Sequence, residues 1–400
     1  GNHTLTVTAT DAAGNVSSTS AGFNIVVDTV APLAPTIIQA FDDVVPGTGT
    51  LSNGAYTNDT RPVLNGSAEA GARVAIYDNG TLLATVTAAI DGTWEYLPAT
   101  LGNGQHVFTA IATDAAGNVS PTSSEFIINV DTIAPSAPLL TSVVDDVAGG
   151  VFNAGLSNGQ LTNDARPTLN GTAEAGSTVS IYDGSTLLGT ALVQSNNSWT
   201  FTPTTPLANG SHTFTVTATD AAGNTSGASA SFTVLVDSVA PSAPVILTVQ
   251  DNTAPTTGPI SNGQISNESR PALSGTGEVG ATITVLSDGQ PIGTTIVGAG
   301  GTWNFTPSTA LGNGLHTLTV TATDSAGNTS LPSGGFTYTV DTQAPAAPVI
   351  TQVADDVGPL TGNLNNGQAT NDARPTLSGT AEANSTVRIY DNGSFIGSIT

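Results

Sequence analysis

Apolar and polar residues alternate along most of the chain. Phe214, Val216 and Ala218, for example, alternate with threonines between residues 213 and 219. The same period of two recurs at residues 169–173, 179–181 and 232–236, and it predicts strands with one buried face. No window of helical length carries an apolar stripe with a period of 3.6 residues. The pattern therefore predicts an all-β protein made of short strands.

Three short segments recur four times in the same order. The segment Thr-Asp-x-Ala-Gly-Asn has its aspartate at Asp11, Asp114, Asp220 and Asp324, at intervals of 103, 106 and 104 residues. A Val-Asp-x-x-Ala-Pro segment follows at the same intervals, and an Asn-acid-x-Arg-Pro segment recurs with them. A unit of about 104 residues has the size of one β-sandwich and is far longer than a solenoid repeat. We therefore expect beads that each have their own core.

Turn residues divide each unit into seven predicted strands in the immunoglobulin Greek-key order. The second strand starts at Arg-Pro, the fifth lies near Trp94, Trp199 or Trp303, and the last ends at Val-Asp. We expect tandem seven-strand immunoglobulin-like β-sandwiches arranged as an elongated rod. Residue 1 opens in mid-pattern, so we expect a segment of a longer protein. The expected division is 1–30 (last strands of a preceding domain), three domains at 31–133, 134–239 and 240–343, and 344–400 (first part of a further domain).

Composition excludes several classes of function. The net charge is −24, from 30 acidic residues and six basic ones, and all six are arginine. Without a basic patch, we expect no binding to nucleic acid or to anionic membranes. No apolar run approaches the ~20 residues of a membrane span, so we expect no membrane insertion. Cysteine is absent, which excludes disulfides, thiol catalysis and cysteine metal sites.

The acidic residues recur at positions where the topology should gather them. In an immunoglobulin-like sandwich the B–C and F–G loops face the linker from the preceding domain, so we expect a linker Asp, a B–C Glu and an F–G Asp to meet at each junction. Unpaired carboxylates repel, and calcium, with 6–8 oxygen ligands, fits better than the stricter magnesium. The predicted calcium ligands are Asp28, Glu69 and Asp114; Asp131, Glu174 and Asp220; Asp237, Glu278 and Asp324; and Asp341 with Glu382.

A second predicted set lies at the other pole of each domain, where the first strand ends. In the third complete domain Asn252 and Glu268 replace two of its aspartates, so we expect weaker calcium binding there. For both sets the alternative is that the acids cap turns without a metal ion. The second set comprises Asp42, Asp43 and Asp59; Asp145, Asp146 and Asp164; Asp251; and Asp355, Asp356 and Asp372.

Other recurrent residues favour structural roles. We interpret the tryptophans as core anchors, and each arginine before proline as neutralising a nearby carboxylate or capping a strand. One histidine per repeat precedes the sixth strand without a second histidine nearby, which predicts turn or edge residues: His3, His106, His212 and His316.

Enzymatic chemistry is not indicated. Residues 155–159 match the hydrolase pattern G-x-S-x-G, but the match occurs in one copy and precedes no helix, so we interpret it as chance. No non-repeating set of acid, base and nucleophile is present. We therefore expect no catalytic activity.

Whole blocks of the repeat resemble bacterial immunoglobulin-like repeats. They are Gly-Thr-Ala-Glu-Ala-Gly-Ser-Thr-Val-Ser-Ile-Tyr-Asp at 171–183, Gly-Ser-His-Thr-Phe-Thr-Val-Thr-Ala-Thr-Asp-Ala-Ala-Gly-Asn at 210–224, and Val-Asp-Ser-Val-Ala-Pro-Ser-Ala-Pro at 236–244. Such repeats build giant non-fimbrial adhesins exported by type I secretion. The resemblance implies a secreted virulence protein of the bacterial surface, with calcium stiffening a monomeric rod.

Two classes of function follow. In the first, the chain extends a distal region that binds the host-cell surface, and we expect glycans to be met through other parts of the protein. In the second, these domains form a carbohydrate-binding module or part of a biofilm matrix. A sugar would be held by exposed aromatic rings or by calcium on a concave, aromatic-lined surface, and aromatic residues make up only 5% of the chain. The sequence therefore favours the extender.

Overall fold

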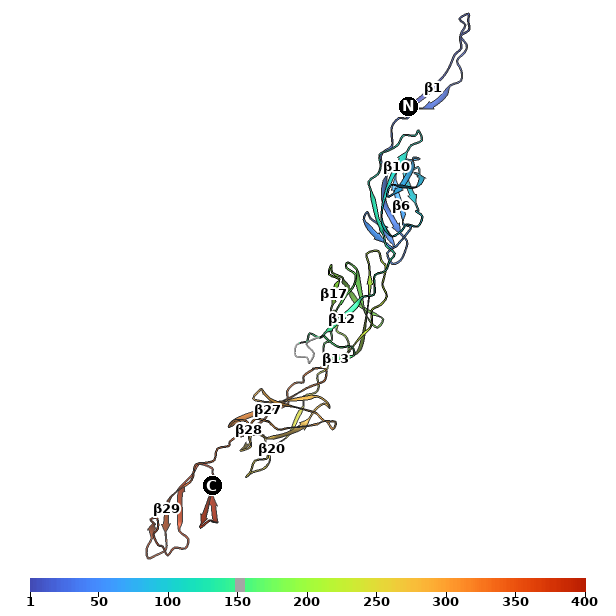
Figure 1. The fold of residues 1–400 in the computed structure, drawn as a ribbon. Helices are drawn as coiled ribbons and strands as arrows, with labels where there is room; N and C mark the ends of the chain where they lie inside the picture. Colours follow the sequence, from blue (N-terminus) through green and yellow to red (C-terminus); the bar gives the residue numbers. More distant parts are fainter. Residues whose placement is uncertain (148–154) are drawn as a thin grey trace. The chain divides into compact units, whose positions relative to one another are not determined.

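The computed structural model describes residues 1–147 and 155–400, and the secondary structure of these residues consists of strands without helices. None of the described residues belongs to a helix long and apolar enough to cross a lipid bilayer. The chain divides into two compact units, 1–239 and 240–400, and each is described by itself. The prediction of tandem all-β sandwiches is confirmed (Figure 1).

The unit 1–239 begins with a hairpin of β1 (Asn2–Leu5) and β2 (Phe23–Val26) and continues into a complete sandwich. One sheet of this sandwich has the order β4-β3-β6-β9, and the other has the order β5-β11-β10-β7-β8. In immunoglobulin lettering β3, β6, β7, β8, β9, β10 and β11 are strands A, B, C, C′, E, F and G. The bounds are β3 (Thr36–Asp42), β4 (Gly49–Leu51), β5 (Ala55–Thr57), β6 (Val63–Ser67), β7 (Arg73–Asp78), β8 (Thr81–Thr87), β9 (Thr93–Tyr96), β10 (Gly104–Thr113) and β11 (Phe126–Val130).

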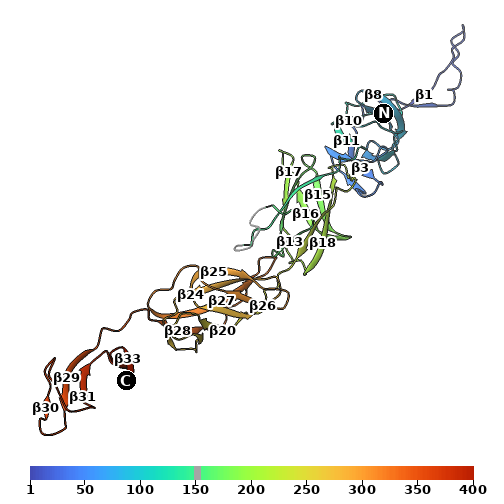
Figure 2. The same ribbon diagram turned by 60° about the horizontal axis from the view of Figure 1, so that its bottom comes forward.

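The second sandwich of this unit repeats the arrangement, with sheet orders β12-β14-β17 and β13-β19-β18-β15-β16 (Figure 2). In this sandwich, strand A is β12 and strand G is β19. The bounds are β12 (Leu139–Val144), β13 (Gln160–Thr162), β14 (Thr168–Thr172), β15 (Thr178–Asp183), β16 (Thr186–Leu192), β17 (Ser198–Phe201), β18 (Gly210–Thr219) and β19 (Phe232–Val236).

The unit 240–400 contains a third sandwich and five further strands. The sandwich has sheet orders β21-β20-β23-β26 and β22-β28-β27-β24-β25. Its bounds are β20 (Val245–Asp251), β21 (Gly258–Pro259), β22 (Ile265–Ser266), β23 (Ala272–Thr276), β24 (Thr282–Ser287), β25 (Gln290–Ile296), β26 (Thr302–Phe305), β27 (Gly314–Thr323) and β28 (Phe336–Val340). The further strands are β29 (Val349–Asp355), β30 (Gly362–Asn363), β31 (Thr376–Thr380), β32 (Val387–Asp391) and β33 (Ser394–Ile399).

Each complete sandwich has one tryptophan at the centre of its core. Trp94, Trp199 and Trp303 are 4%, 3% and 1% exposed, as their role as core anchors requires. A glycine on the neighbouring strand B makes room for the ring. In the second sandwich, a Cβ added to Gly171 would lie 2.3 Å from Trp199 Cζ2 and 2.1 Å from the Leu139 carbonyl oxygen. No side chain larger than hydrogen fits there.

The short strand β5 brings the end of strand A and the end of strand G together in the first sandwich. It pairs in parallel with strand G, so that Thr57 lies opposite Val130. Strand A also ends at this side, because Asp42 Oδ2 accepts a hydrogen bond from Thr57 Oγ1. We call this end of each domain, where strand G passes into the following linker, the exit pole.

Candidate metal centre

The exit pole of the first sandwich carries two buried carboxylates joined through a hydroxyl. Asp42 is 1% exposed and Asp59 is 3% exposed. Thr57 Oγ1 donates to Asp42 Oδ2 and accepts from the Asp59 amide at 3.0 Å. Asp42 Oδ1 accepts from the Val44 amide at 2.8 Å, and Asp59 Oδ1 accepts from the Arg61 amide at 2.7 Å. The sequence Asn-acid-x-Arg-Pro therefore closes a turn against the end of strand A.

The same acid–hydroxyl–acid network occurs in every later repeat. The hydroxyl donates to the strand-A aspartate at 2.6–2.7 Å and accepts from the amide of the second acid at 2.9–3.1 Å. We call these four sets the exit-pole networks. Beyond Asp42, Thr57 and Asp59, they are Asp145, Thr162 and Asp164; Asp251, Ser266 and Glu268; and Asp355, Thr370 and Asp372.

Several oxygen atoms at these networks are buried and receive no hydrogen bond. They are Oδ2 of Asp59 and the amide oxygens of Asn58, Asn163 and Asn267. A buried oxygen without a donor is costly, and an ion or water normally accounts for it. The asparagines belong to the recurrent Asn-acid-x-Arg-Pro segment, but the sequence did not single them out as ligands. Their recurrence next to the acid was the available signal.

The electrostatics of the network disfavour a bare carboxylate. Burial, and then the negative charges of Asp42 and Asp43, raise the pKa of Asp59. Burial, with neighbouring Asp146 and Asp145, raises the pKa of Asp164 in the same way. A cation would relieve both the desolvation and the repulsion. The donor set of carboxylate and amide oxygens is the one that calcium prefers, so the residues present fit such an ion.

The third sandwich differs at this point because Glu268 replaces aspartate. Glu268 Oε2 accepts from the Asn252 amide at 2.9 Å and from Thr253 Oγ1 at 3.1 Å. Its Oε1 accepts from the Arg270 amide at 2.7 Å. The longer side chain thus satisfies both of its oxygens within the protein by bonds of 2.7–3.1 Å. Asp164 Oδ2 and Asp372 Oδ2 accept only longer bonds, of 3.4 and 3.3 Å, from the amides of Asp146 and Asp356, and Asp59 Oδ2 has no donor. The third network therefore has less to offer a cation than the other three.

The linker aspartates lie beside the exit-pole networks of their own domains. The Asp131 amide donates to the Thr57 carbonyl at 2.9 Å, and Asp237 and Asp341 make the same bond to Thr162 and Ser266. Thr57 is also the residue whose hydroxyl holds Asp42. Each linker aspartate and the second predicted set of the domain before it therefore lie at the same pole.

The next domain contacts the same linker through an asparagine of its F–G loop. Within residues 1–239, Asn224 Nδ2 donates to the Asp131 carbonyl at 2.9 Å. Asn118 Nδ2 donates to the Asp28 carbonyl at 3.2 Å. These bonds join linker and F–G loop as the junction hypothesis required, but through asparagine and backbone rather than through two carboxylates.

The F–G aspartates are used within their own turns. Asp114 Oδ1 accepts from the amides of Ala116 and Asn118 at 2.9 and 2.8 Å, and Oδ2 accepts from Asn118 Nδ2 at 2.8 Å. These bonds, led by the Asn118 side chain, hold the pKa of Asp114 below its usual value. Asp11, Asp220 and Asp324 accept the same three bonds. This geometry is that of the turn-capping alternative.

The B–C glutamates stand apart from both sets. Glu69, Glu174, Glu278 and Glu382 are exposed. Within residues 1–147 and 155–400, no three Asp, Glu or His side chains converge closely enough to enclose a metal ion by themselves. A cation at an exit-pole network would therefore also need amide, backbone or water oxygens. Among the predicted ligands, the strand-A and loop acids fit a cation best.

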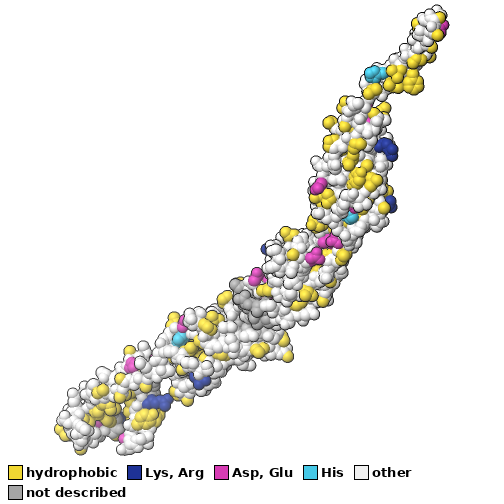
Figure 3. Space-filling view, turned by 45° about the horizontal axis from the view of Figure 1, so that its top comes forward, with side chains coloured by type: hydrophobic (Ala, Val, Ile, Leu, Met, Phe, Trp, Pro, Cys, Tyr) yellow, Lys and Arg dark blue, Asp and Glu magenta, His cyan; other side chains and the backbone are white. Residues whose placement is uncertain are grey.

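Arginine does not neutralise these acids. Nε of Arg61, Arg166 and Arg270 donates to a proline carbonyl at 2.8–3.2 Å, while the backbone amide of each holds the acid two residues before it. The prediction of a neutralising arginine is thus replaced by an arginine that ties two loops together. On the face shown in Figure 3, basic side chains form only small separate patches.

Comparison with known proteins gives a relative by sequence. Exoglucanase B of Cellulomonas fimi is 29% identical over 327 residues, which is 79% of this chain and 26% of that protein. The chain thus spans about a quarter of the length of this relative. The activity of the relative does not follow from this match.

Solved structures match the chain at low sequence identity and low TM-score. A tetra-tandem repeat from the extending region of a large adhesion protein is 21% identical, with 86% of this chain and 82% of that chain covered and a TM-score of 0.25. Fibronectin(III)-like modules of Clostridium thermocellum CbhA are 18% identical, with 46% and 90% covered and a TM-score of 0.30. At such scores the likeness carries no information about function.

Family membership rests on the sequence of the sandwiches themselves. The family model described as bacterial Ig-like domain matches residues 36–132, 144–238 and 242–342, which is most of the chain. Each match falls on one complete two-sheet sandwich with its buried tryptophan. Sequence and fold agree, and the chain belongs to the bacterial Ig-like domain family.

Proposed function

We propose that this chain is a calcium-stiffened extender segment of a bacterial surface adhesin. Its tandem domains project a distal region, which adheres to host cells, away from the bacterium. The observation that carries the proposal is the exit-pole network. It occurs in four repeats, and in three of them it leaves a buried oxygen without a donor.

Calcium would act by fixing the linker to the domain that precedes it. Asp42, Asp59 and the Asn58 amide oxygen would hold the ion beside the charge of Asp43. The bond from the Asp131 amide to the Thr57 carbonyl would join the linker to this site. The ion supplies positive charge where burial raises the pKa of Asp59. A linker held in this way loses the freedom of a hinge, while the Asn224 bond to Asp131 ties it to the following domain.

Location and export follow from the repeat type. The motifs resemble those of giant non-fimbrial adhesins, and most of all SiiE of Salmonella. This resemblance supports type I secretion, a place on the bacterial surface and a role in virulence. The absence of cysteine is consistent with folding outside an oxidising compartment. Extracellular calcium sites commonly have Kd values of about 10⁻⁴–10⁻³ M, so the extender would stiffen after export.

A structural role is favoured over enzymatic or sugar-binding roles. The three tryptophans are at most 4% exposed, so their rings are not available to stack on a sugar. The titratable groups of the exit-pole networks recur in each domain instead of forming one catalytic set. We therefore propose neither catalysis nor carbohydrate binding for these domains.

Calorimetry and small-angle scattering of the intact chain test the proposal. At calcium one hundred times above Kd, each occupied site should add about 2.7 kcal/mol to the free energy of unfolding. When calcium is chelated, the maximum dimension of the molecule measured by scattering should decrease, or the distribution of its interatomic distances should broaden. An unchanged melting temperature together with an unchanged scattering profile in excess chelator would contradict the proposal.

The matched variants for this test are Asp59→Asn and Glu95→Gln. Both remove one negative charge from the first sandwich, but Asp59 is buried in the network and Glu95 is exposed on β9. Only Asp59→Asn should weaken the calcium response. Equal loss in both variants would show that calcium acts through net charge alone.

A further inference from the structure

Each complete sandwich contains one histidine, and each histidine is paired with a carboxylate. In the first sandwich, His106 Nδ1 lies 2.7 Å from Asp78 Oδ2. The other ring nitrogen, Nε2, lies 2.9 Å from the carbonyl oxygen of Gly102. The ring therefore bridges the end of strand C and the E–F loop at the exit pole. The sequence had predicted only a turn or edge residue.

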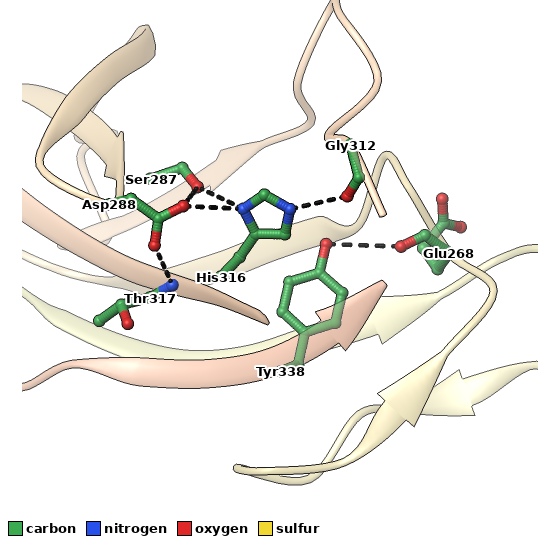
Figure 4. A network of polar contacts seen from close by, with 7 residues as sticks. All are labelled: Glu268, Ser287, Asp288, Gly312, His316, Thr317 and Tyr338. Carbon is green, nitrogen blue, oxygen red and sulfur yellow. Dashed lines mark hydrogen bonds and ion pairs between the residues drawn. The ribbon is translucent and has the colours of Figure 1, made fainter. Parts of the chain in front are cut away.

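The other two sandwiches repeat this bridge. His212 Nδ1 lies 2.7 Å from Asp183 Oδ2, and its Nε2 lies 2.7 Å from the Ala208 carbonyl oxygen. His316 Nδ1 lies 2.9 Å from Asp288 Oδ2, and its Nε2 lies 2.8 Å from the Gly312 carbonyl oxygen (Figure 4). The His side chains are 12–15% exposed.

The carboxylate that contacts the histidine occupies one position of the repeat in the first two sandwiches and the next position in the third. Where the first two sandwiches have Asp78 and Asp183, the third has Ser287, and Asp288 on the next residue takes over the contact. Asp288 adopts a φ of 52°, at the first position of the tight turn between β24 and β25. Figure 4 shows Ser287 and Asp288 both directed at His316 Nδ1. Because two positions deliver one contact, a turn preference alone does not explain the acid.

The geometry fixes the number of protons in the pair. A carboxylate and a carbonyl oxygen are both acceptors, whereas a neutral imidazole has one donor nitrogen and one acceptor nitrogen. A neutral ring beside an ionised carboxylate would thus leave one nitrogen lone pair facing an acceptor at 2.7–2.9 Å. The pair satisfies both contacts only with one additional proton, on the ring or on the carboxyl group.

The surroundings add no competing charge at the ring. Phe108 stacks on His106 with ring centroids 6.1 Å apart, and Tyr338 lies 6.3 Å from His316. Burial, with the charges of Glu268 and Asp251, raises the pKa of Tyr338, so this phenol stays neutral. The Tyr338 hydroxyl donates to the Glu268 carbonyl at 3.4 Å (Figure 4). Among the described residues, the partner carboxylate is the charged group that forms an ion-pair contact with each ring.

In the third sandwich the carboxylate itself is stabilised as an anion. The Thr317 amide donates to Asp288 Oδ1 at 2.8 Å. This bond first, and then the hydrogen bond and charge of His316, hold the pKa of Asp288 below its usual value. The additional proton of this pair therefore belongs on the imidazole.

The loop held by the histidine also holds the exit linker. Asn103, next to Gly102, accepts hydrogen bonds on Oδ1 from the Thr132 amide at 3.2 Å and from Thr132 Oγ1 at 2.9 Å. Thr132 directly follows the linker residue Asp131. The corresponding pairs are Asn209 with Ser238, at 3.1 and 2.8 Å, and Asn313 with Thr342, at 3.1 and 2.8 Å.

We infer that each His–Asp pair is a proton-dependent clasp that fixes the E–F loop and, through its asparagine, the start of the exit linker. With the proton bound, both ring nitrogens donate and the loop is held. When the proton leaves, one contact becomes a repulsion between two acceptors, and the loop and linker loosen. The His–Asp contact itself contains no predicted calcium ligand, whereas Asn209 Nδ2 also donates to Oδ1 of the linker residue Asp237 at 3.3 Å.

The first test follows the ring nitrogens of the intact chain by ¹⁵N NMR in excess chelator. His3 serves as an internal reference because it is exposed on β1 and no pair like those above is recorded for it among the described residues. His106, His212 and His316 should keep two ring protons at pH values at which His3 has lost one. Simultaneous loss of the proton from all four histidines would overturn the proposal.

The second test measures hydrogen exchange at the linker, again in chelator. The protection factor of the Ser238 amide should fall roughly tenfold as the clasp loses its proton, the effect of about one hydrogen bond. In His212→Gln it should be low at all pH values, while Thr132 and Thr342 keep their pH dependence as controls within the same chain. His3→Gln should change none of the three.

A pH-independent protection factor for Ser238 in the parent chain would overturn the proposal. Because calcium is absent throughout, failure of the clasp would leave the calcium response unaffected. Failure of the calcium response would likewise leave the clasp testable. The two proposals therefore fail separately.

Discussion

Asp288 Oδ2 lies 2.9 Å from Nδ1 of His316, although the residue that aligns with the acid of the other domains is Ser287. The neighbouring residue thus restores a contact that the substitution would have removed. Within one chain, this is evidence that the contact matters more than the position that supplies it. Asp78 and Asp183, which occupy the position of Ser287, contact His106 and His212. They are not members of the exit-pole networks, so Ser287 does not alter the network of the third sandwich.

Asp59→Asn should change stability in opposite directions with and without calcium. In chelator the substitution removes a buried charge whose pKa is raised by burial and by Asp42 and Asp43, so the free energy of unfolding should rise by on the order of 1 kcal/mol. In saturating calcium it removes a ligand, so the free energy should fall. Urea unfolding in both conditions measures this, with Glu95→Gln as the charge control. The same sign in both conditions would contradict the assignment of Asp59 to the site.

The pH dependence without calcium should follow from the same acids. The pKa values of Asp59 and Asp164 are raised in the folded state, so the folded protein binds more protons than the unfolded chain. Their contribution is present below the unfolded value of about 3.9 and is lost as pH rises through the folded pKa. Calorimetry in chelator should therefore show stability falling above about pH 4. The double variant Asp59→Asn/Asp164→Asn should flatten this fall.

Asp114 acts in the opposite sense and in a different pH range. Its pKa is lowered, first by the Asn118 side chain, so its contribution is present above the unfolded value and is lost as pH falls through the lower folded value. The two effects separate because one lies above about pH 3.9 and the other below it. If Asp59→Asn/Asp164→Asn lost stability above pH 4 as steeply as the parent chain, the contribution assigned to Asp59 and Asp164 would be contradicted.

Gly171→Ala should strongly destabilise the second sandwich. Its Cβ would lie 2.1 Å from the Leu139 carbonyl oxygen and 2.3 Å from Trp199 Cζ2, so either the strand or the ring must move. We expect a loss of about 1–3 kcal/mol or more, as for overpacked cores, measured by urea unfolding with Trp fluorescence. Gly227→Ala is the control, since a Cβ at Gly227 meets nothing within 4 Å. Equal stability of the two variants would contradict the packing role of this glycine.

Asn224→Ala should loosen the linker at Asp131. The substitution removes the 2.9 Å bond from Asn224 Nδ2 to the Asp131 carbonyl, together with its bond to Asp220 Oδ2. Proteolysis of the linker should accelerate by roughly tenfold, the effect of about one hydrogen bond. Asn15→Ala controls for the turn, because Asn15 makes the corresponding bond to Asp11 in its own loop. Equal proteolysis of this linker in both variants would show that the bond to Asp131 does not restrain it.

The sequence by itself determined the strands, the sandwich type and the buried tryptophans. These depend on period-two alternation, turn residues and repeat length, all of which are local properties of the chain. Phe214, Val216 and Ala218, for example, lie fully buried along β18 as their alternation predicted. The acidic residues could also be identified as recurrent, because recurrence needs no coordinates.

Only the tertiary structure decided which of these residues meet. The parallel pairing of β5 with β11 places Thr57 opposite Val130, and this register brings Asp131 to the pole that holds Asp42 and Asp59. No local pattern specifies such a register. Likewise, a turn motif shows that Asp114 is present, but only the folded loop shows that its oxygens are already used by backbone and side-chain donors. Side-chain chemistry depends on distances across strands that are far apart in sequence, and these distances arise only when the sheets pack.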